Sequence, residues 1–317
     1  VSDIPFNPDF VWFKKRDGAS ASELYDQVRG ATKYLISNSN DAEDTNVNGL
    51  TAFGTGGWTI GGNGLAHSGT MVAWNWKAGT TSGISTNGST TITPTAYSFN
   101  ATAGFSIIKY TGNGTTGAKY PHGLGVAPKM VIVKNLGTTD WWNVHHASLG
   151  NNSEMYLNTT DAAPGSTGNG TTPDSVNIEL EGTTNTHNGS GNNYIAYCFA
   201  EKTGYSKVNK YIGNGNADGT FVYTGFKPSF ILIKLSSATA DWQIFDNKRE
   251  GYNNVNDALY PNLNSAEGST ARIQLLSNGF KLVDNNNWGW NKDGETYTYY
   301  AVGQSLVGTN NTPCTSR

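Results

Sequence analysis

The chain of 317 residues is patterned as short apolar runs separated by Gly, Asn, Ser and Thr. Residues 130–133 (MVIV) and 230–233 (FILI) are typical of these runs, which are rich in β-branched and aromatic side chains and bounded by Pro and Gly. Runs of this length are too short for helices, and their composition is typical of strands. Helical periodicity is nearly absent, so the pattern predicts an all-β fold.

One phrase occurs three times: PDFVWFK at residues 8–14, PKMVIVK at 128–134 and PSFILIK at 228–234. We expect the proline to open a strand, where its missing N–H removes no ladder hydrogen bond, and the apolar run to fill a core. The lysine is predicted to mark the point where the chain returns to solvent. The phrase is therefore interpreted as part of a structural repeat and not as a functional motif.

Further correspondences follow each phrase in the same order. A strand pair is predicted around GGWTIG, VNIELEG and GFKLVD, and a closing aromatic run follows as MVAWNW, YIAYCF and YTYYAV. The second and third copies are introduced by related phrases, GFSIIKYTGNG at 104–114 and GYSKVNKYIGNG at 204–215. The first copy lacks this introduction, which indicates that it is truncated on its N-terminal side.

These correspondences predict three tandem β-sandwich-like repeats of roughly 100 residues, the size expected of six or seven short strands in two sheets. The first repeat covers residues 1–79, a Thr/Ser/Gly-rich connector covers 80–103, the second and third repeats cover 104–203 and 204–304, and a polar tail covers 305–317. Ser20 and Glu23 have capping-box spacing for one helical turn, but the equivalent region of the third repeat is rich in Asn and favours a non-helical reading.

Composition narrows the classes of partner. The net charge is −3 at pH 7 and no basic stripe is visible, so we expect no nucleic-acid partner. No apolar run approaches the roughly 20 residues of a membrane helix, and no membrane insertion is expected. Cys198 lies in the apolar run YIAYCFA and is predicted to be a buried thiol, whereas Cys314 lies in the polar tail. The start at Val1 leaves open whether residues precede it in the full protein.

The phrases PDFVWFKKRDG, VRGATKYL, FSIIKYTGNG and HGLGVAPKMVIVKN occur in this order within residues 4–304. This series resembles a repeated β-rich domain family of uncharacterised function that occurs in virion surface proteins, including tail fibres, of marine and other environmental bacteriophages. The resemblance implies a phage protein on the extracellular virion surface, and it transfers no catalytic residue to this chain.

Two acid and arginine pairs are the most site-like polar feature. Asp26 with Arg29 and Asp246 with Arg249 occupy equivalent positions in the first and third repeats, and His146 occupies the place of the aspartate in the second. One interpretation is a ligand contact repeated three times. We favour a structural role in which the guanidinium ties a loop to the sheet, because the second repeat replaces the pair without losing the fold.

The histidines do not form a metal-binding pattern. His145 and His146 are adjacent on a predicted strand and point to opposite faces, so they are poorly placed to bind one ion. The other three, His67, His122 and His187, lie in turn-like settings. Neither G-x-S-x-G nor a phosphate-binding glycine loop occurs. We therefore expect no metal, no cofactor and no enzymatic activity.

The loop DNNNWGWNKDG at residues 284–294 carries the candidate ligand-binding residues, which are Asn287, Trp288, Trp290, Asn291 and Asp293. Exposed tryptophan rings beside amides and carboxylates are suited to sugars, since the ring faces the apolar side of a pyranose while the polar groups bind its hydroxyls. The competing interpretation is that the two tryptophans pack on the sheet or on a neighbouring subunit. A Ca²⁺ site formed by the loop oxygens is a further alternative.

Two functions from different classes follow. The first is a tail-fibre or receptor-binding module that contacts bacterial surface polysaccharide, and the second is a purely structural virion component such as a capsid decoration or fibre-shaft protein. A glycan depolymerase is a distant third, because the paired acids that it needs cannot be identified in one sequence. The expected partners are other virion proteins, and the expected assembly is a homotrimer.

Overall fold

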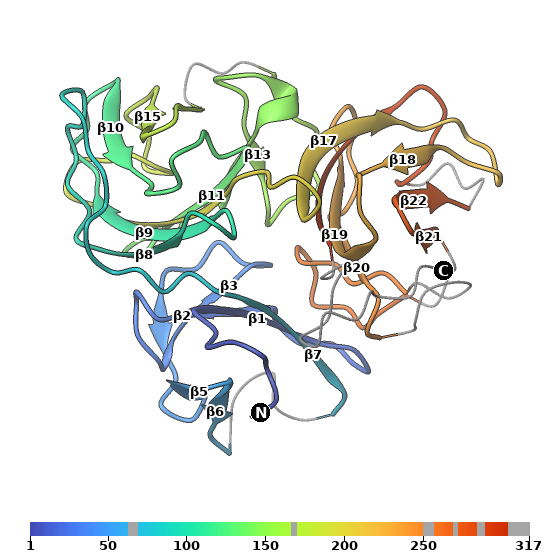
Figure 1. The fold of residues 1–317 in the computed structure, drawn as a ribbon, viewed down its shortest axis with the longest axis horizontal. Coiled ribbons are helices and arrows are strands. Elements are labelled where there is room, and N and C mark those ends of the chain that lie inside the picture. Colours follow the sequence, from blue (N-terminus) through green and yellow to red (C-terminus); the bar gives the residue numbers. More distant parts are fainter. Residues whose placement is uncertain (63–68, 166–169, 250–256, 269–271, 284–288, 304–317) are drawn as a thin grey trace. The chain divides into compact units, whose positions relative to one another are not determined.

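The computed structural model describes residues 1–62, 69–165, 170–249, 257–268, 272–283 and 289–303 (Figure 1). Among these residues every strand pair is antiparallel, and the only helical element is a single 3₁₀ turn, η1 (Ala147–Leu149). The all-β prediction is therefore confirmed. The chain divides into two compact units, which are described separately below.

Unit 1 comprises Val1–Thr159, Pro164–Ala200 and Pro261–Ala266. Its first sheet has the strand order β4-β3-β2-β1-β7, and a separate hairpin is formed by β5 and β6. Residues 1–79 supply all of these strands and are called the first segment. The strands are β1 (Phe10–Lys15), β2 (Glu23–Asp26), β3 (Lys33–Ile36), β4 (Asp44–Thr45), β5 (Leu50–Gly54), β6 (Gly57–Ile60) and β7 (Met71–Trp76).

The second sheet of unit 1 has the order β13-β12-β11-β16-β9-β8, and a three-stranded sheet, β10-β15-β14, accompanies it. Residues 104–203 are called the second segment. The strands are β8 (Ala96–Asn100), β9 (Phe105–Thr111), β10 (Ala118–Pro121), β11 (Met130–Asn135), β12 (Asn143–His146), β13 (Met155–Tyr156), β14 (Thr171–Pro173), β15 (Asn177–Leu180) and β16 (Asn193–Phe199).

Unit 2 comprises Thr160–Ala163, Glu201–Tyr260 and the described residues from Glu267 onward. It has a four-stranded sheet, β17-β23-β19-β20, and a three-stranded sheet, β18-β22-β21. Residues 204–304 are called the third segment. The strands are β17 (Ser206–Ile212), β18 (Phe221–Tyr223), β19 (Pro228–Leu235), β20 (Gln243–Asp246), β21 (Ile273–Leu276), β22 (Gly279–Leu282) and β23 (Thr296–Gly303).

The strand of each repeated phrase lies between two other strands of its sheet. Strands β1, β11 and β19 each pair with the strand that follows the phrase on one side and with the closing aromatic strand on the other. One face of each closing strand packs against the smaller sheet or hairpin of the same segment, as shown by the core contact of Tyr299 and Phe280 in the third segment. This is the β-sandwich-like arrangement that the alternation of side chains favours.

The predicted exposure of the repeated lysine is wrong. The side chains of Lys14, Lys134 and Lys234 are buried, with exposed fractions of 1%, 0% and 0%. The apolar stem of a lysine can follow the core while its ammonium group reaches carbonyl oxygens, and this combination is not visible in the local pattern. The polar contacts of these ammonium groups are described below.

Other local expectations can now be compared with the structure. Residues 23–26, at the possible helical turn, form β2. The connector at 80–103 contributes β8 to the second sheet and places Ile92 in the core. Cys198 is a free, buried cysteine, as expected, and burial raises its pKa to about 12. Cys314 lies outside the described residues.

Candidate functional site

The buried lysines hold loops that come from other segments. Lys134 Nζ donates to the carbonyl oxygens of Asn40 and Asn135, both at 3.1 Å. Asn40 belongs to the first segment, and the same oxygen accepts the backbone N–H of Asp140 at 2.8 Å. Burial lowers the pKa of Lys134 to about 8. This lysine therefore fixes a first-segment loop onto the second sheet.

The other two lysines make the corresponding contacts. Lys14 Nζ donates to the carbonyl oxygens of Ser20 at 3.0 Å and Leu263 at 2.6 Å. Lys234 Nζ donates to those of Thr160 at 2.9 Å and Ala240 at 2.5 Å. Burial also lowers the pKa of both lysines to about 8. Each of these lysines therefore binds a loop from another segment. Lys14 of the first segment binds a loop of the third, Lys134 of the second binds a loop of the first, and Lys234 of the third binds a loop of the second.

Arg29 ties the loop after β2 to its own strand. Its Nε donates to Asp26 Oδ2 at 2.5 Å, its Nη2 donates to the carbonyl oxygen of Leu24 at 2.8 Å, and its Nη1 lies 3.5 Å from Glu43 Oε2. Tyr197 of the second segment donates its hydroxyl to Asp26 Oδ2 at 2.7 Å. Because Asp26 and Arg29 are both fully used within the protein, they leave little capacity for a ligand.

Arg249 repeats this network in the third segment. Its Nε donates to Asp246 Oδ2 at 2.7 Å, its Nη2 to the carbonyl oxygen of Ile244 at 3.2 Å and its Nη1 to Glu267 Oε2 at 2.8 Å. The matching pairs are thus Arg29 with Glu43 and Arg249 with Glu267. These contacts are those of a structural tie.

The second segment has neither the arginine nor the glutamate of these pairs. Leu149 stands at the position of Arg29 and Arg249, and Ala163 stands at that of Glu43 and Glu267. His146 is buried, and its Nδ1 accepts the backbone N–H of Ser148 at 3.3 Å. Loss of the cation together with its anion avoids a buried charge without a partner, which is costly.

The predicted ligand loop is only partly within the described residues, because Asn287 and Trp288 lie outside them. The expectation of an exposed ring is wrong for Trp290, which is 6% exposed. The guanidinium carbon of Arg272 lies 3.9 Å from the centroid of this ring, and the Trp290 carbonyl oxygen accepts the Tyr211 hydroxyl at 2.7 Å. The ring is therefore buried in the core of the third segment, with Arg272 over one of its faces, and is not available to a sugar.

Asn291 is also buried, with an exposed fraction of 0%. Its Oδ1 accepts the backbone N–H of Asn214 at 3.1 Å, and its Nδ2 donates to the carbonyl oxygen of Asn216 at 2.9 Å. These bonds fix the GNG turn after β17. Asp293 is exposed at the surface beside this turn, whereas Trp290, the aromatic residue of this loop that lies within the described residues, is buried.

The described histidines are all buried. Burial lowers the pKa of His145 to about 3 and of His187 to about 4, so both are neutral at physiological pH. His122 lies with Nε2 3.1 Å from the carbonyl oxygen of Asp174. His67 lies outside the described residues, and within them no group of three or more His, Cys, Asp or Glu side chains is placed to hold a metal ion.

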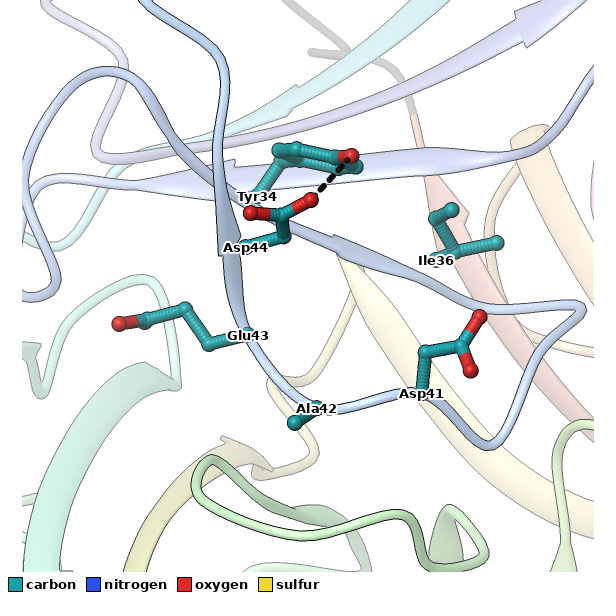
Figure 2. A pocket seen from close by; sticks show the side chains of 6 residues that line it. All are labelled: Tyr34, Ile36, Asp41, Ala42, Glu43 and Asp44. Atoms are coloured by element: carbon teal, nitrogen blue, oxygen red, sulfur yellow. Dashed lines mark hydrogen bonds between the residues drawn. The ribbon is translucent and has the colours of Figure 1, made fainter.

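A shallow hollow of about 290 Å³ lies between β3 and the loop that leads into β4. Figure 2 shows the Tyr34 hydroxyl pointing to Asp44 Oδ2, to which it donates at 3.1 Å, while Glu43 extends away from them. Glu43 accepts from Lys33 Nζ at 2.9 Å, and Asp41 accepts from the Ser39 hydroxyl at 2.6 Å. Burial raises the pKa of Tyr34 to about 12. The hollow thus combines one aromatic ring with two exposed carboxylates.

Trp141 is the large exposed aromatic of the second segment, with an exposed fraction of 48%. Its ring lies 4.9 Å from that of Tyr156 at an interplanar angle of 40°. The Tyr156 hydroxyl donates to Glu154 Oε1 at 2.8 Å, which fixes the supporting ring. Counted from the repeated lysines, the equivalent residues are Ala21 and Asp241, so the ring is specific to this segment.

The backbone beneath Trp141 is anchored on both sides. The adjacent Trp142 is fully buried, and its Nε1 donates to the carbonyl oxygens of Ile36 and Ser39 at 3.0 and 3.1 Å. Asp140 donates its N–H to the carbonyl oxygen of Asn40, the residue before Asp41 of the hollow. The exposed indole is therefore held on a rigid base that also carries the carboxylates of the hollow.

Residues 1–305 match the family described as a domain of unknown function, DUF7483. The chain is a member of the DUF7483 family. Comparison with curated proteins and with solved structures found no match. Within the described part of this DUF7483 chain, no helix has the length and hydropathy needed to cross a bilayer.

Sequence reasoning missed Trp141, although a signal was present. A tryptophan stands where the equivalent positions carry Ala21 and Asp241, directly before Trp142, whose counterpart in the third segment is Trp242. Both Trp142 and Trp242 are buried, so only one ring of the Trp141–Trp142 pair is required by the core. In this DUF7483 chain, the surplus ring is the better candidate for recognition of a ligand.

Proposed function

We propose that this protein is a bacteriophage virion surface protein that binds bacterial surface glycan, as an adhesion module of a tail fibre. The resemblance of its phrases to phage virion proteins supports the location. The observation that carries the binding function is the half-exposed Trp141, which rests on Tyr156 and is anchored by its neighbours. The three segments are proposed to be tandem repeats, and the assembly a homotrimer built with other virion proteins.

The contact follows from the chemistry of the two surfaces. The indole face covers the apolar C–H side of a pyranose ring, and the rigid base limits the conformational entropy lost on binding. Asp41 and Asp44 project from the hollow that adjoins the same loop and are exposed, so their carboxylates can accept hydroxyl hydrogen bonds. The arrangement favours a neutral or hydroxyl-rich glycan over one with closely spaced anionic groups.

The experiment measures binding of the purified protein to host cells and to their isolated surface polysaccharide, with Trp141→Ala as the test variant. Because an aromatic anchor contributes about 2 kcal/mol or more, we expect binding to weaken by at least about tenfold. Tyr223→Ala is the matched control, since Tyr223 is an exposed aromatic residue of the third segment, 65% exposed. Its binding should change by less than about twofold.

Two results contradict the proposal in different ways. If wild-type protein binds the polysaccharide and Trp141→Ala binds equally well, glycan binding stands but the site is wrong. If the protein is found in purified virions by mass spectrometry but binds neither cells nor polysaccharide, the purely structural virion role replaces it. Polysaccharide cleavage by the purified protein would instead indicate a depolymerase.

A further inference from the structure

Strand β7 is the edge of its sheet within the described residues. It pairs with β1 on one side. The corresponding closing strands are covered on both sides: β16 lies between β11 and β9, and β23 lies between β19 and β17. Figure 1 shows β7 next to β1 in the first sheet, and β9 next to β8 in the second. Within the described residues, the first segment therefore has no strand that corresponds to β9 and β17, which are called the opening strands.

The residue that pairs with each repeated lysine shows which residues of β7 correspond to those of the other closing strands. Lys134 pairs with Ile195 and Lys14 pairs with Val72, so Tyr194, Ala196 and Cys198 correspond to Met71, Ala73 and Asn75. In the second segment, those three residues pair with Tyr110, Ile108 and Ser106 of β9, and each is 0% exposed. Met71, Ala73 and Asn75 are only half-buried.

A pocket of about 670 Å³ opens beside the same edge, lined by Phe13, Trp58, Ile60, Met71, Ala73 and Asn75 among others. In the third segment the side chain of Tyr211, from β17, occupies the equivalent place. The Tyr211 ring lies 4.8 Å from Tyr297, 5.9 Å from Phe280 and 6.4 Å from Tyr299.

These three neighbours of Tyr211 correspond by pairing to Met71, Trp58 and Ala73 of the pocket. The second segment is alike, since Tyr110 stacks on Tyr194 at 5.2 Å. The pocket therefore has the position that a tyrosine of an opening strand fills in the other two segments.

We propose that the outer edge of β7 and this pocket bind one extended polypeptide strand with the sequence pattern of β9 and β17. The strand runs antiparallel to β7 and inserts its tyrosine between Trp58 and Met71. Main-chain hydrogen bonds to Met71, Ala73 and Asn75 supply affinity, and the tyrosine supplies specificity. The incoming strand replaces the hydrogen bond that Asn75 Nδ2 donates to the Ala73 carbonyl oxygen at 3.0 Å. An uncovered sheet edge of this kind is a template for pairing with another chain.

A second copy of β7 is a poorer occupant than this strand. Antiparallel pairing of two β7 strands would bring together Met71, Ala73 and Asn75 of both copies, and none of these side chains is an aromatic ring that fills the pocket. The strands that do cover the equivalent edge share the pattern Lys-Tyr near their C-terminal ends, in F-S-I-I-K-Y of β9 and S-K-V-N-K-Y of β17. The structure thus favours that pattern.

The neighbouring edge of the β5–β6 hairpin is already covered. Val1 exchanges two hydrogen bonds with Trp58, from the Val1 amino group to the Trp58 carbonyl oxygen and from the Trp58 N–H to the Val1 carbonyl oxygen, both at 3.1 Å. Val1 thus has the place of Tyr120, which pairs with Ile178 in the second segment. A strand joined to the chain directly before Val1 would therefore have the same connection to the hairpin edge that β9 has to β10 in the second segment.

The experiment uses fluorescein-labelled peptide GFSIIKYTGN, which has the sequence of residues 104–113, and measures its anisotropy with the whole chain. We expect saturable binding of one peptide per chain, at least about tenfold weaker for the peptide that carries Tyr110→Ala. Ala73→Pro in the protein should abolish binding, because proline removes an N–H from the outer edge. Circular dichroism and thermal melting check that this variant is folded.

A second protein keeps the test decisive if Ala73→Pro does not fold. Residues 104–119 are appended directly before Val1, which places the added tyrosine as far ahead of Val1 as Tyr110 lies ahead of Tyr120. This chain should not bind the peptide and should melt at a higher temperature than the original. Equal peptide binding by the two chains overturns the proposal, as does absence of saturable binding by the folded original. Self-association that the peptide does not inhibit would assign the edge to a second copy and likewise overturn it.

Discussion

At the scale of single residues, the most informative side chains are the lysines that end the repeated phrase. Each is buried and donates two hydrogen bonds to carbonyl oxygens. A neutral amine still has two N–H groups, so these bonds survive deprotonation. Burial without a neighbouring carboxylate bound to Nζ explains why the pKa of each lysine falls to about 8.

The first prediction is that alkaline conditions stabilise the fold. Below pH 8 the lysines are protonated in both states. Between about pH 8 and 10.4 the unfolded chain holds protons that the folded chain has released, so the free energy of unfolding rises with pH. We expect a rise on the order of 1–3 kcal/mol per lysine, measured by urea unfolding followed by tryptophan fluorescence.

The rise should end near pH 10, because tyrosines of the unfolded chain then ionise while burial keeps the pKa of Tyr110, Tyr120 and Tyr211 well above the ordinary value. Lys134→Met retains most of the apolar stem and should reduce the rise by about one third. A free energy of unfolding that is flat or falls between pH 8 and 9.5 would contradict the assignment.

The second prediction concerns the Arg29 network. Arg29→Leu leaves Asp26 buried without its guanidinium partner and should cost about 3–5 kcal/mol of unfolding free energy. Glu43→Ala should cost about 1 kcal/mol, since Glu43 is at the border of the network with a side chain 12% exposed. The double variant, which copies Leu149 and Ala163 of the second segment, should cost less than the sum of the two.

An exposed ion pair provides the control for this comparison. Lys281 contacts Asp218, whose side chain is 85% exposed, and Lys281→Met should change the unfolding free energy by less than about 1 kcal/mol. If Arg29→Leu costs no more than this control in urea unfolding, the network contributes little to stability and the structural interpretation fails.

At the scale of elements, the chain is organised by loops that dock on the sheet of another segment. Residues 36–43 of the first segment are held on the second sheet by Trp142, Lys134 and the backbone. The backbone bonds are Asp140 N–H to Asn40 O at 2.8 Å and Glu43 N–H to Leu136 O at 3.0 Å. In unit 2, the bonds Ala240 N–H to Thr160 O and Ala163 N–H to Ser236 O, both at 2.9 Å, correspond to these.

The third prediction tests this docking. Trp142→Phe keeps a buried ring but removes the N–H that two carbonyl oxygens accept, and should cost about 1–3 kcal/mol. Hydrogen exchange measured by NMR should accelerate at the amides of Asp140 and Glu43. The amides of Ile132 and Lys134, within β11, are the internal control and should keep their protection. Uniform acceleration of all four amides would show that the variant lowers global stability without releasing the loop.

At the scale of the whole molecule, the two units each contain a segment that belongs in sequence to the other. Pro261–Ala266 is part of unit 1, where Ser37 Oγ donates to the Pro261 carbonyl oxygen at 2.7 Å and Lys14 binds that of Leu263. Thr160–Ala163 is part of unit 2. Unfolding of either unit therefore removes a docked loop from the other.

The fourth prediction is that the chain unfolds in one cooperative transition. Calorimetry should give a ratio of calorimetric to van't Hoff enthalpy close to one, although a chain of this length could contain independently unfolding domains. Two resolved melting transitions, each retained when the other unit is destabilised by substitution, would contradict it. Arg29→Leu and Arg249→Leu are matched substitutions for units 1 and 2.

Much of the fold could be predicted from the sequence because strand formation is a local property. The apolar runs of β11 and β19, the prolines before them and the glycine-rich turns indicate strands without knowledge of their partners. The candidate site could not be predicted from the sequence to the same extent. Exposure of Trp141 and burial of Trp290 depend on packing by Tyr156, Arg272 and Tyr211, which lie elsewhere in the sequence.

The sequence by itself determined that the chain is all-β and that similar phrases recur along it. Only the tertiary structure decided that the repeated lysines are buried and that each binds a loop from another segment. The reason is the range of the interactions: strand propensity acts over a few residues, whereas Lys14 and the Leu263 carbonyl oxygen are 249 residues apart in sequence. Contacts over such separations form only when the chain is folded, and they decide which polar groups remain available for a partner.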